Sequence, residues 1–549
     1  MATLKPLALQ HIADASRATL WEQTFSAAVW RPVIGERAVV LEAEGEDITL
    51  VGARAGRRRE LGAVRNGRRT LQRAELAEDW LWLEGRIRSA TWRLETALDL
   101  PPVTAVIPTY RREDDALAQA ERFLEMEVVT EVLVVDQGGT LAQDPRLRRL
   151  LAHEERLRLV TQPNLGGSGG YARGMLEAGR NPGAAVLFSD DDAVISGESL
   201  RRMLAFQTLA PRPTILGAPL FSSKKPQRLL AHSETVDTRT FNWRPTGLES
   251  GPMNLRGTTP VDWGALAPST PATYTGWWGT LFPPGTAADL GLPLPLFLKW
   301  DDAEYGLRAT ARGYDHAVLP GTAVHHPPWN AHITQMSWPA RLLHRNRLAV
   351  AAGSGAGRGV IVSSFAHQCK HVLAGHLLTA ELWEAGIDEF RAGPDAWLGD
   401  DQNRARSEGE RIVEAWHHEC DFPSPVAPTH TSPRPLPIAL GHALLRLSTP
   451  DRAPRVTLRV PSKKVRWTTT MGADAVQITR GGTPLEAYRV RGSHMRRALA
   501  RSIASHLDLA LRWGALRRRY RRALPQHTTV EAWTALFADA APGTPTGRD

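Results

Sequence analysis

The 549-residue sequence predicts an α/β protein with a mostly parallel central sheet, preceded by a small antiparallel β domain and followed by a helical region. Three observations lead to this prediction. Between residues 101 and 190, apolar strand-like runs alternate with helical segments, which is typical of a parallel sheet covered by helices. Before residue 99, short alternating segments are separated by Gly, Asn and charged turns. After about residue 340, the pattern becomes helical.

The changes of pattern also set the expected domain boundaries. They give an N-terminal β domain at 1–99, a central α/β domain at 100–345 and a helical domain at 346–549. Within the last, we expect one long helix over 365–390 that ends before Gly393 and Pro394. We also expect a proline-rich linker near 423–437 and a disordered tail at 540–549.

Each strand expected in the central domain is followed by residues that suit a nucleotide. Pro108-Thr-Tyr-Arg111 follows the first strand and Asp136-Gln-Gly-Gly the second. A segment with Asn164 and the glycine run at 166–170 follows the third, and the aspartates at 190–192 follow the fourth. Because the carboxyl ends of parallel strands meet at one edge of a sheet, we expect these residues to line one crevice.

The three consecutive aspartates predict a metal site. They follow an apolar strand, where their mutual repulsion is costly unless a cation lies between them. In an extended segment Asp190 and Asp192 point to the same side and can reach one divalent ion, while Asp191 points elsewhere. His326, in the segment His325-His-Pro-Pro-Trp329, is a candidate third ligand. This arrangement would hold a metal–diphosphate.

A second acidic cluster, Asp301-Asp302, opens a helical pattern about 110 residues later. On a structural interpretation one of the two aspartates caps that helix. On a functional one, an aspartate that faces a sugar hydroxyl beside a metal-bound diphosphate is the general base of a glycosyl transfer. Upstream, Trp277 and Trp278 are flanked by glycines, so that one can stack on a sugar while the other packs inward.

The glycine run at 166–170 opens a helix and admits two interpretations. Its backbone N–H groups can approach a phosphate closely. A purely structural turn is an equal alternative, because the run lacks the Lys-Ser/Thr ending of a P-loop and the dinucleotide-binding glycine spacing.

Composition restricts the partners and the compartment. The formal charge of +9 suggests anionic partners, without separating nucleotide sugars, nucleic acids and anionic lipids. We find no recognised nucleic-acid-binding motif and expect no nucleic-acid partner. Two cysteines cannot build a disulfide framework, so we expect an intracellular protein. Because neither a signal peptide nor an apolar run of 18 residues is present, we expect a chain that is neither exported nor membrane-spanning.

The segment 495–524 predicts a basic helix with five arginines between 517 and 522. An apolar stripe formed by Leu499, Ile503, Leu507 and Leu511 runs beside them. One interpretation is a surface helix packed on the body of the protein, and the other is contact with anionic lipid headgroups. Assembly into a homo-oligomer is left open.

In combination these motifs resemble the inverting glycosyltransferases of the GT-A fold, and within them the polymerising galactofuranosyltransferases of mycobacterial cell-wall galactan. The resemblance covers most of the chain. It is carried by the segments 108–111, 135–138, 162–171, 189–192, 276–278, 293–308, 319–321, 326–329, 345–348, 387–394 and 518–525.

The resemblance implies a GT-A (Rossmann-like) nucleotide-sugar domain between an N-terminal β-sandwich and a mainly helical C-terminal domain. It implies UDP-galactofuranose as donor, Mn²⁺ or Mg²⁺ as cofactor, and a polyprenyl-diphosphate-linked glycan as acceptor, at the cytoplasmic face of the cell membrane. By position it assigns donor binding to Arg111, Asp136, Asn164, Gly167 and Asp191, and metal binding to Asp190, Asp192 and His326. It assigns the role of general base to Asp302, and the sugar and acceptor site to Trp277, Trp278, Asp301 and Trp329.

Two departures from the resemblance concern the acceptor. His325 stands where a large aromatic residue is expected, and the segment after Trp329 lacks an expected acidic run. The alternatives are a transferase of the same fold with another donor (UDP-galactopyranose, dTDP-rhamnose or a GDP sugar) and a non-catalytic carbohydrate-binding protein. The paired acidic clusters argue against the latter, because a binder needs neither metal carboxylates nor a base.

Overall fold

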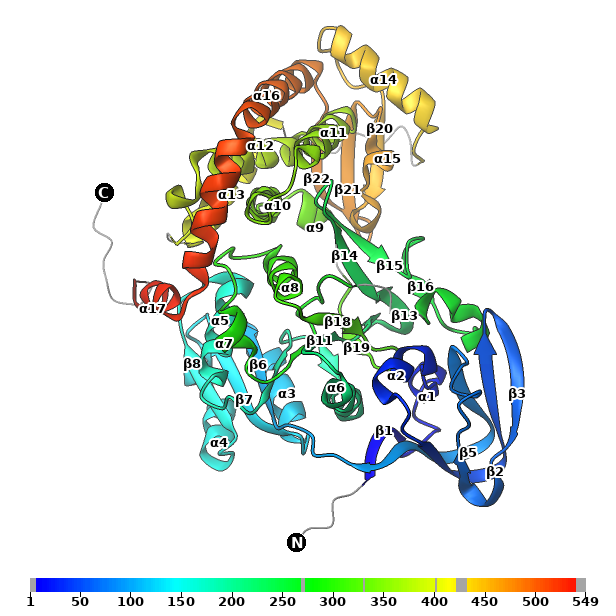
Figure 1. Cartoon of the computed structure of the whole chain (residues 1–549). Coiled ribbons are helices and arrows are strands. Elements are labelled where there is room, and N and C mark those ends of the chain that lie inside the picture. Colours follow the sequence, from blue (N-terminus) through cyan, green and yellow to red (C-terminus); the bar gives the residue numbers. More distant parts are fainter. Residues whose placement is uncertain (1–5, 268–271, 329–330, 400–401, 421–431, 540–549) are drawn as a thin grey trace.

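The computed structural model describes residues 6–267, 272–328, 331–399, 402–420 and 432–539. The predicted fold class, a mixed α/β protein with a helical C-terminal region, is confirmed (Figure 1). The tail predicted at 540–549 lies outside the described residues, and so does the proline-rich linker up to residue 431. The last residues predicted for that linker, 436 and 437, begin the helix that starts at Leu436.

The N-terminal region contains one antiparallel sheet in the order β1-β5-β2-β3, with β4 paired to β2. Its elements are β1 (Pro6–Ile12), α1 (Leu20–Gln23), α2 (Ala27–Ile34), β2 (Val39–Arg54), β3 (Arg57–Ala63), η1 (Arg65–Gly67), β4 (Arg68–Thr70) and β5 (Trp80–Ala97). The two stacked sheets of a sandwich are therefore replaced by a single sheet. The central region packs against this sheet and against α2, since Trp80 of β5 packs on Trp263 and Trp30 of α2 packs on Phe206.

The central sheet has seven strands in the order β18-β11-β17-β9-β6-β7-β8. The strands are β6 (Val103–Thr109), β7 (Val129–Asp136), β8 (Leu157–Thr161), β9 (Ala185–Phe188), β11 (Thr214–Gly217), β17 (Thr280–Phe282) and β18 (Asp315–Val318). Neighbouring strands are parallel except β17, which is antiparallel to β9 and β11. The chain runs from β6 to β7 and β8 on one side and returns to β9 on the other, so the strand order reverses at β6. In such sheets the ligand crevice lies at this reversal.

Helices cover both faces of the central sheet. They are α3 (Glu113–Leu124), η2 (Leu141–Gln143), α4 (Pro145–His153), α5 (Gly166–Ala178), α6 (Gly197–Leu209), α7 (Thr286–Leu290) and α8 (Asp301–Ala311). The short helix η3 (Pro260–Leu266) instead packs against β2 of the N-terminal sheet. Successive residues of β6 point to opposite faces, as the period of a strand requires. Ala105 and Ile107 pack in a core with Phe123 of α3, whereas Val106 packs in a core with Met175 of α5.

A smaller sheet and a hairpin lie beside the carboxyl ends of the central strands. The sheet has the order β10-β19-β12-β13-β16, and β14 pairs with β15. The bounds are β10 (Val194–Ile195), β12 (Leu220–Ser222), β13 (Lys225–Ala231), β14 (Ser233–Asp237), β15 (Asn242–Thr246), β16 (Met253–Asn254) and β19 (Val324–His326). The pairing of Val194 with His325 places the end of β19 next to the loop that follows β9.

The C-terminal region is mainly helical with one three-stranded sheet. It contains α9 (Ala331–Gln335), α10 (Pro339–Gly353), α11 (Gly359–Leu373), α12 (Leu377–Ala392), η4 (Pro394–Ala396), α13 (Gln402–Cys420), α14 (Leu436–Ser448), β20 (Thr457–Pro461), η5 (Ser462–Lys464), α15 (Trp467–Thr470), β21 (Ala475–Arg480), β22 (Thr483–Arg489), α16 (Gly492–Ala523), η6 (Leu524–Thr528) and α17 (Val530–Asp539). The predicted basic helix corresponds to α16. The helix α17 returns to the central region (Figure 1). There Trp533 Nε1 donates a 2.7 Å hydrogen bond to the Pro293 carbonyl.

The single helix predicted over 365–390 is wrong, because two helices, α11 and α12, occupy this range. The break falls at Gly375, whose φ of 74° lies in the left-handed region that favours glycine.

Candidate active site

Three potential metal ligands come from two separate strand ends. Asp190 and Asp192 follow β9, and His326 ends β19. His326 Nε2 lies 3.1 Å from Asp192 Oδ1 and 4.0 Å from Asp190 Oδ2. One ligand atom from each residue lies within 4.8 Å of the other two. The structure therefore brings together the three residues that the sequence assigned to a metal.

The chemistry of this cluster fits a divalent cation. Two carboxylates and one imidazole are ligands that such ions accept. His326 Nδ1 lies 2.6 Å from the Pro327 carbonyl, and a proton on Nδ1 leaves the Nε2 lone pair facing the carboxylates. Burial opposes ionisation of Asp192, but its bonds with His326 and Arg112 lower its pKa to about 2. Tyr171 Oη lies 2.7 Å from Asp190 Oδ1 and orients that carboxylate.

Residues 191 and 192 lie in a turn, not in the extended segment that the sequence prediction assumed. Asp191 is nevertheless outside the group of three potential metal ligands. It is buried, and its carboxylate accepts from Thr109 Oγ1 at 2.8 Å and pairs with Arg112 at 3.2 Å. Burial raises the pKa of Asp191 to about 7 against the opposing effects of Arg112 and Thr109. Arg112 also bonds Asp192 at 2.7 Å, so it links the end of β6 to the loop after β9. The sequence interpretation missed Arg112, whose only signal was its position beside Arg111.

The predicted donor-binding residues lie at the ends of β6, β7 and β8, and they differ in accessibility. Arg111 is exposed, with a φ of 54°, and its guanidinium lies 5.3 Å from the Tyr110 ring. Asn164 Oδ1 accepts from the Gly166 amide at 3.0 Å. Asp136 is fully buried, and its carboxylate accepts from three backbone amides, those of Gly138, Gly139 and Leu141. Its carboxylate is therefore used to shape the turn after β7.

Gln137 joins two of these loops and was missed by the sequence interpretation. Its Oε1 accepts from the Leu165 amide at 3.0 Å and from Gln162 Nε2 at 3.1 Å. Its Nε2 donates to the Gly166 carbonyl at 3.0 Å. The side chain thereby fixes the start of α5 relative to the end of β7.

The glycine run permits close packing at the start of α5. A Cβ on Gly166, which has a φ of 69°, would lie 2.1 Å from the Phe297 carbonyl oxygen. A Cβ on Gly170 would lie 2.6 Å from Pro108 Cβ. Gly167 faces Asp301, whose Oδ2 is 3.6 Å from the ideal Cβ position. The structural interpretation thus accounts for Gly166 and Gly170, and Gly167 is the member of the run that faces the second acidic cluster.

The second acidic cluster forms the first turn of α8. The N-cap is Trp300, so Asp301 and Asp302 follow the cap position, where the helix dipole favours negative charge. The preceding turn has left-handed backbone at Phe297, Lys299 and Trp300, with φ of 67°, 71° and 71°. Each such non-glycine residue costs about 1–3 kcal/mol, and strain of this kind concentrates at functional sites. We call residues 296–302 the base turn, after the sequence prediction that Asp302 is a general base.

Burial and like charges act on the two aspartates of the base turn. Burial raises the pKa of Asp301, against a 3.0 Å hydrogen bond from Ser168 Oγ. The pKa of Asp302 is raised well above its ordinary value by burial and by the charges of Asp301 and Glu234. Lys299 is close enough to lower the pKa of both aspartates. A carboxylate with a raised pKa accepts a proton more readily.

Glu234 and Tyr274 belong to this acidic cluster, although no motif indicated them. Tyr274 Oη donates to Glu234 Oε2 at 2.7 Å, and burial raises the pKa of Glu234. Glu234 lies on β14, about 70 residues before Asp302, so only the fold brings the two together.

The base turn is held by a helix of the C-terminal region. Asn346 of α10 places its Nδ2 within 3.0 Å of the carbonyls of Leu296, Leu298 and Lys299. Its Oδ1 accepts from Arg345 Nε at 2.9 Å. Asn346 is fully buried, so it can satisfy these carbonyls in place of water. The conformation of the base turn therefore depends on α10.

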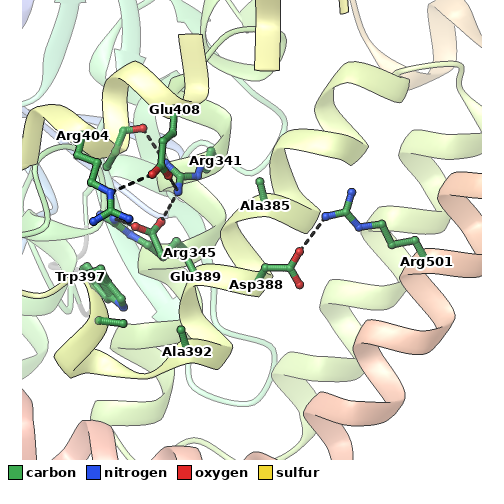
Figure 2. Close-up of a pocket in the computed structure, with 12 residues that line it drawn as sticks. Arg341, Arg345, Ala385, Asp388, Glu389, Ala392, Trp397, Arg404, Glu408 and Arg501 are labelled. Carbon is green, nitrogen blue, oxygen red and sulfur yellow. Dashed lines mark hydrogen bonds and ion pairs between the residues drawn. The ribbon is translucent and has the colours of Figure 1, made fainter. Parts of the chain in front are cut away.

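Arg345, which bonds Asn346, belongs to a network of ion pairs that joins α10 to α12 and α13 around a cavity of about 360 Å³ (Figure 2). Arg345 pairs with Glu389 at 3.0 Å and lies 3.9 Å from the Trp397 ring. Arg341 pairs with Glu389 and Glu408. Because its central charges are paired with one another, we interpret this cavity as part of the framework that fixes α10.

The two adjacent tryptophans have different environments. Trp277 is 6% exposed and packs among Tyr171, Phe188 and Tyr305. Trp278 is half-buried, and its ring lies over Gly276, where a Cβ would be 2.1 Å from ring atoms. The pair therefore has one inward and one more accessible ring. Trp329, the remaining aromatic residue assigned to the acceptor, lies outside the described residues.

Comparisons with known proteins give two family matches. Residues 101–349 match the model described as glycosyltransferase like family 2. Residues 421–539 match the model for domain 3 of galactofuranosyltransferase-2. The first match spans the central sheet and α10, and the second covers the C-terminal sheet with α14, α16 and α17.

Two curated proteins are similar over most of the chain. The galactofuranosyltransferase GlfT2 of Mycolicibacterium smegmatis is 30% identical over 499 residues, which cover 84% of this chain and 77% of that protein. The GlfT2 of Mycobacterium tuberculosis is 30% identical over 469 residues, covering 79% and 73% respectively.

Solved structures are more distant. GalNAc-T7 with UDP, GalNAc and Mn²⁺ has 11% identity and a TM-score of 0.35, covering 47% of this chain and 52% of that one. The mannosyltransferase PcManGT from Pyrobaculum calidifontis, in complex with GDP-Man and Mn²⁺, has 15% identity and a TM-score of 0.34, covering 58% and 84%. Similarity this low assigns no chemistry to the present chain.

Proposed function

The chain belongs to the galactofuranosyltransferase GlfT2 family, and from that premise we propose that it transfers galactofuranose from UDP-galactofuranose to a glycan acceptor, with inversion at the anomeric carbon. One observation supports this reaction most directly. A cluster of metal-type ligands lies at the carboxyl ends of the central strands, and a separate buried acidic cluster opens α8 beside α5. An inverting transfer from a nucleotide sugar can use a cation at the diphosphate and a base at the acceptor hydroxyl.

Asp190, Asp192 and His326 would hold a divalent cation, for which Mn²⁺ and Mg²⁺ are the candidates. When bound, such a cation offsets the negative charge that grows on the UDP leaving group. Arg112 and Tyr171 keep the two carboxylates in position, because each bonds one of them directly. Similar supporting contacts orient metal ligands in other proteins.

The donor would lie across the ends of β6, β7 and β8. Arg111, which is exposed, and the start of α5 at Gly167 would meet the diphosphate, and Asn164 shapes the loop at the start of α5. Asp136 would act indirectly, because its carboxylate is occupied by the turn amides. Asp191 would likewise act indirectly, through Thr109 and Arg112.

Asp302 is the proposed general base. It takes the proton of the acceptor hydroxyl while that oxygen forms a bond to the anomeric carbon and the bond from this carbon to the UDP oxygen breaks. UDP leaves with the electron pair, and one displacement inverts the configuration. The raised pKa of Asp302 supports this role, because a more basic carboxylate transfers the proton more readily. Asp301, Trp278 and Trp329 would border the sugar and the acceptor.

We further propose that the acceptor is linked to a lipid and that the protein contacts the inner face of the membrane peripherally. The apolar stripe of α16 is exposed, with 44% of Ile503, 62% of Leu507 and 83% of Leu511 accessible. Arginines flank this stripe on the same helix, and anionic headgroups attract them. Across the described part of the chain, no helix is long and apolar enough to cross a bilayer.

Co-sedimentation with vesicles tests the membrane contact. We expect binding to anionic vesicles, weaker binding to neutral ones, and loss of binding in the variant Leu507→Ser/Leu511→Ser. Equal binding to both vesicle types, or none, would contradict the contact.

The transfer itself is tested by UDP release in the presence of Mn²⁺ from a panel of nucleotide sugars. The acceptor is a galactofuranosyl disaccharide on an alkyl chain, and the product is identified by mass spectrometry and its anomeric configuration by NMR. We expect extension from UDP-galactofuranose with inversion. Turnover with another donor of the panel would overturn the assigned sugar, and binding of all donors without turnover would favour a carbohydrate-binding protein.

A further inference from the structure

A cavity of about 590 Å³ lies beside the base turn and is used by none of the steps above. Trp300, the residue before Asp301, forms part of its wall. The rest of the wall comes from the β14–β15 hairpin, from α9, α10, α11 and α12 with the N-cap residue of α12, and from the segment that begins α15. None of the metal-type ligands lines it. The cavity therefore adjoins the acidic end of the active site and not the metal end.

The wall of this cavity is positively charged. It contains Arg347, Lys370 and Arg466 and no aspartate or glutamate. Arg347 is 4% exposed and donates to the Phe241 and Thr240 carbonyls and to Ser363 Oγ, all neutral acceptors. Its Nη1 has no hydrogen-bond partner. A buried guanidinium without a carboxylate is costly, so the site favours an anion.

Lys370 is a second cation without a counter-charge. It is half-buried on α11, and no carboxylate of the described residues pairs with it. Burial and the nearby Arg347 lower the pKa of Lys370, and burial lowers the pKa of Arg347 to about 10. The two cations repel each other in the same cavity. An anion bound between them would offset that repulsion and would give each cation a partner of opposite charge.

The remaining walls present aromatic faces and neutral imidazoles. Trp243 is 53% exposed and Trp467 is 36% exposed, and they come from β15 and α15. Exposed tryptophan faces suit the apolar faces of sugar rings. Burial holds the pKa of His344 and His371 well below the ordinary value, and the Nδ1 atoms of both lack partners. The cavity thus offers surfaces for a sugar as well as for an anion.

We propose that this cavity binds the phosphate-bearing part of a sugar-phosphate acceptor, with the anion at Lys370 and Arg347 and adjoining sugar rings against Trp243 and Trp467. The inference rests on the proposed glycosyl transfer, since it assigns a binding site to the phosphate-bearing part of the acceptor. The acceptor is favoured over the donor because the cavity adjoins the base turn through Trp300 and shares no residue with the metal cluster.

Binding is measured first, independently of turnover. The full chain is kept in EDTA, so that the metal cluster holds no ion, and tryptophan fluorescence is followed during titration with inorganic pyrophosphate. Lys370→Gln and Arg466→Gln remove one charge each, and Lys463→Gln, an exposed lysine outside the cavity, is the matched control. We expect Lys370→Gln to weaken binding about tenfold, the usual value of one charged hydrogen bond. Lys463→Gln should match the wild type.

Kinetics then identify the source of the anion. The same glycan is offered on a neutral alkyl chain and on an alkyl diphosphate. Lys370→Gln should raise KM about tenfold for the diphosphate acceptor and leave KM for the neutral acceptor unchanged. If wild-type protein does not discriminate between the two acceptors, the site binds a free anion and the acceptor assignment is overturned.

Other outcomes separate this inference from the proposed function. Pyrophosphate binding that is absent in EDTA, or unchanged in both Lys370→Gln and Arg466→Gln, overturns the site even if galactofuranose is transferred. Binding that depends on Lys370 in a protein that transfers no galactofuranose supports the anion site and contradicts the proposed function.

Discussion

The two halves that we propose for the active site, a metal half at Asp190, Asp192 and His326 and a base half at the base turn, are built in different ways. Asp190 and Asp192 come from one strand end, and a short ladder between β10 and β19 adds His326. The base half needs three left-handed non-glycine residues, a glutamate from a distant hairpin and a clamp from α10. Two of the three metal-type ligands are therefore close together in the sequence, whereas the position of the proposed base depends on how the C-terminal helices pack.

The largest expected effect is a loss of turnover, and it distinguishes the base half from the metal half. Asp302→Asn should lower turnover by about 10²- to 10⁴-fold, the usual contribution of a general base. UDP binding in the presence of Mn²⁺ should stay close to wild type, because Asp302 is not among the metal-type ligands. The measurement is kcat beside calorimetric UDP binding, with the exposed Asp114→Asn as control. Near-native turnover would remove Asp302 from the role of base.

A second substitution tests whether the C-terminal region controls the base half. Asn346→Asp keeps the shape of the side chain but points carboxylate oxygens at the carbonyls of Leu296, Leu298 and Lys299. We expect kcat to fall about 10- to 100-fold, because small misplacements of a catalytic group are costly. KM for the donor and Mn²⁺-dependent UDP binding should change little.

The control for this substitution is Asn181→Asp at an exposed loop, and thermal melting identifies variants that are merely unfolded. If donor binding and kcat fall together in folded Asn346→Asp protein, the clamp does not act on the base half alone.

A smaller effect is expected in the metal half. Tyr171→Phe removes the hydroxyl that lies 2.7 Å from Asp190 Oδ1. We expect Mn²⁺ affinity to fall about tenfold, the lower end for a lost supporting contact to a metal ligand. Tyr488→Phe is the matched control, because its buried hydroxyl has no hydrogen-bond partner. Equal Mn²⁺ affinities in the two variants would show that Tyr171 does not support the metal half.

The smallest effect is a shift of the pH profile. The pKa of Asp302 is raised by burial and then by Asp301 and Glu234, so the proton-accepting form is lost as pH falls through a value above the ordinary one. Activity should therefore decline on the acid side at a higher pH than an exposed aspartate would give. Glu234→Gln removes one negative neighbour and should move this decline to lower pH. The exposed Glu249→Gln should leave the profile of kcat against pH unchanged, and an unmoved profile in Glu234→Gln would argue against the coupling.

Much of the fold and of the metal half was predictable from the sequence. Apolar strands followed by polar residues indicated the central sheet and its crevice. The prediction that Asp190 and Asp192 face one ion assumed an extended segment, whereas residues 191 and 192 lie in a turn, and this turn together with the end of β19 groups the potential ligands. The inward packing of one of Trp277 and Trp278 was also expected, although the sequence did not say which. The single N-terminal sheet was not predicted, because the short alternating segments do not reveal that β2 and β5 are long and pair along most of their length.

The base half could not be predicted in the same way. Glycine usually marks left-handed backbone, yet Phe297, Lys299 and Trp300 adopt it because Asn346 holds the adjoining carbonyls. Glu234, Arg112 and Asn346 carry no local motif, and each acts on residues that only the tertiary fold brings near. The opposite error occurred at Gly375, because an isolated glycine is compatible with a continuous helix and the periodic pattern runs through it.

The division of the active site into two halves is tested most directly by titrating UDP binding with Mn²⁺ in Asp192→Ala and Asp302→Asn side by side. The account predicts that Asp192→Ala loses the metal-dependent part of UDP binding, whereas Asp302→Asn retains it and loses turnover. Normal Mn²⁺ dependence in Asp192→Ala, or the same loss of UDP binding in both variants, would contradict the account.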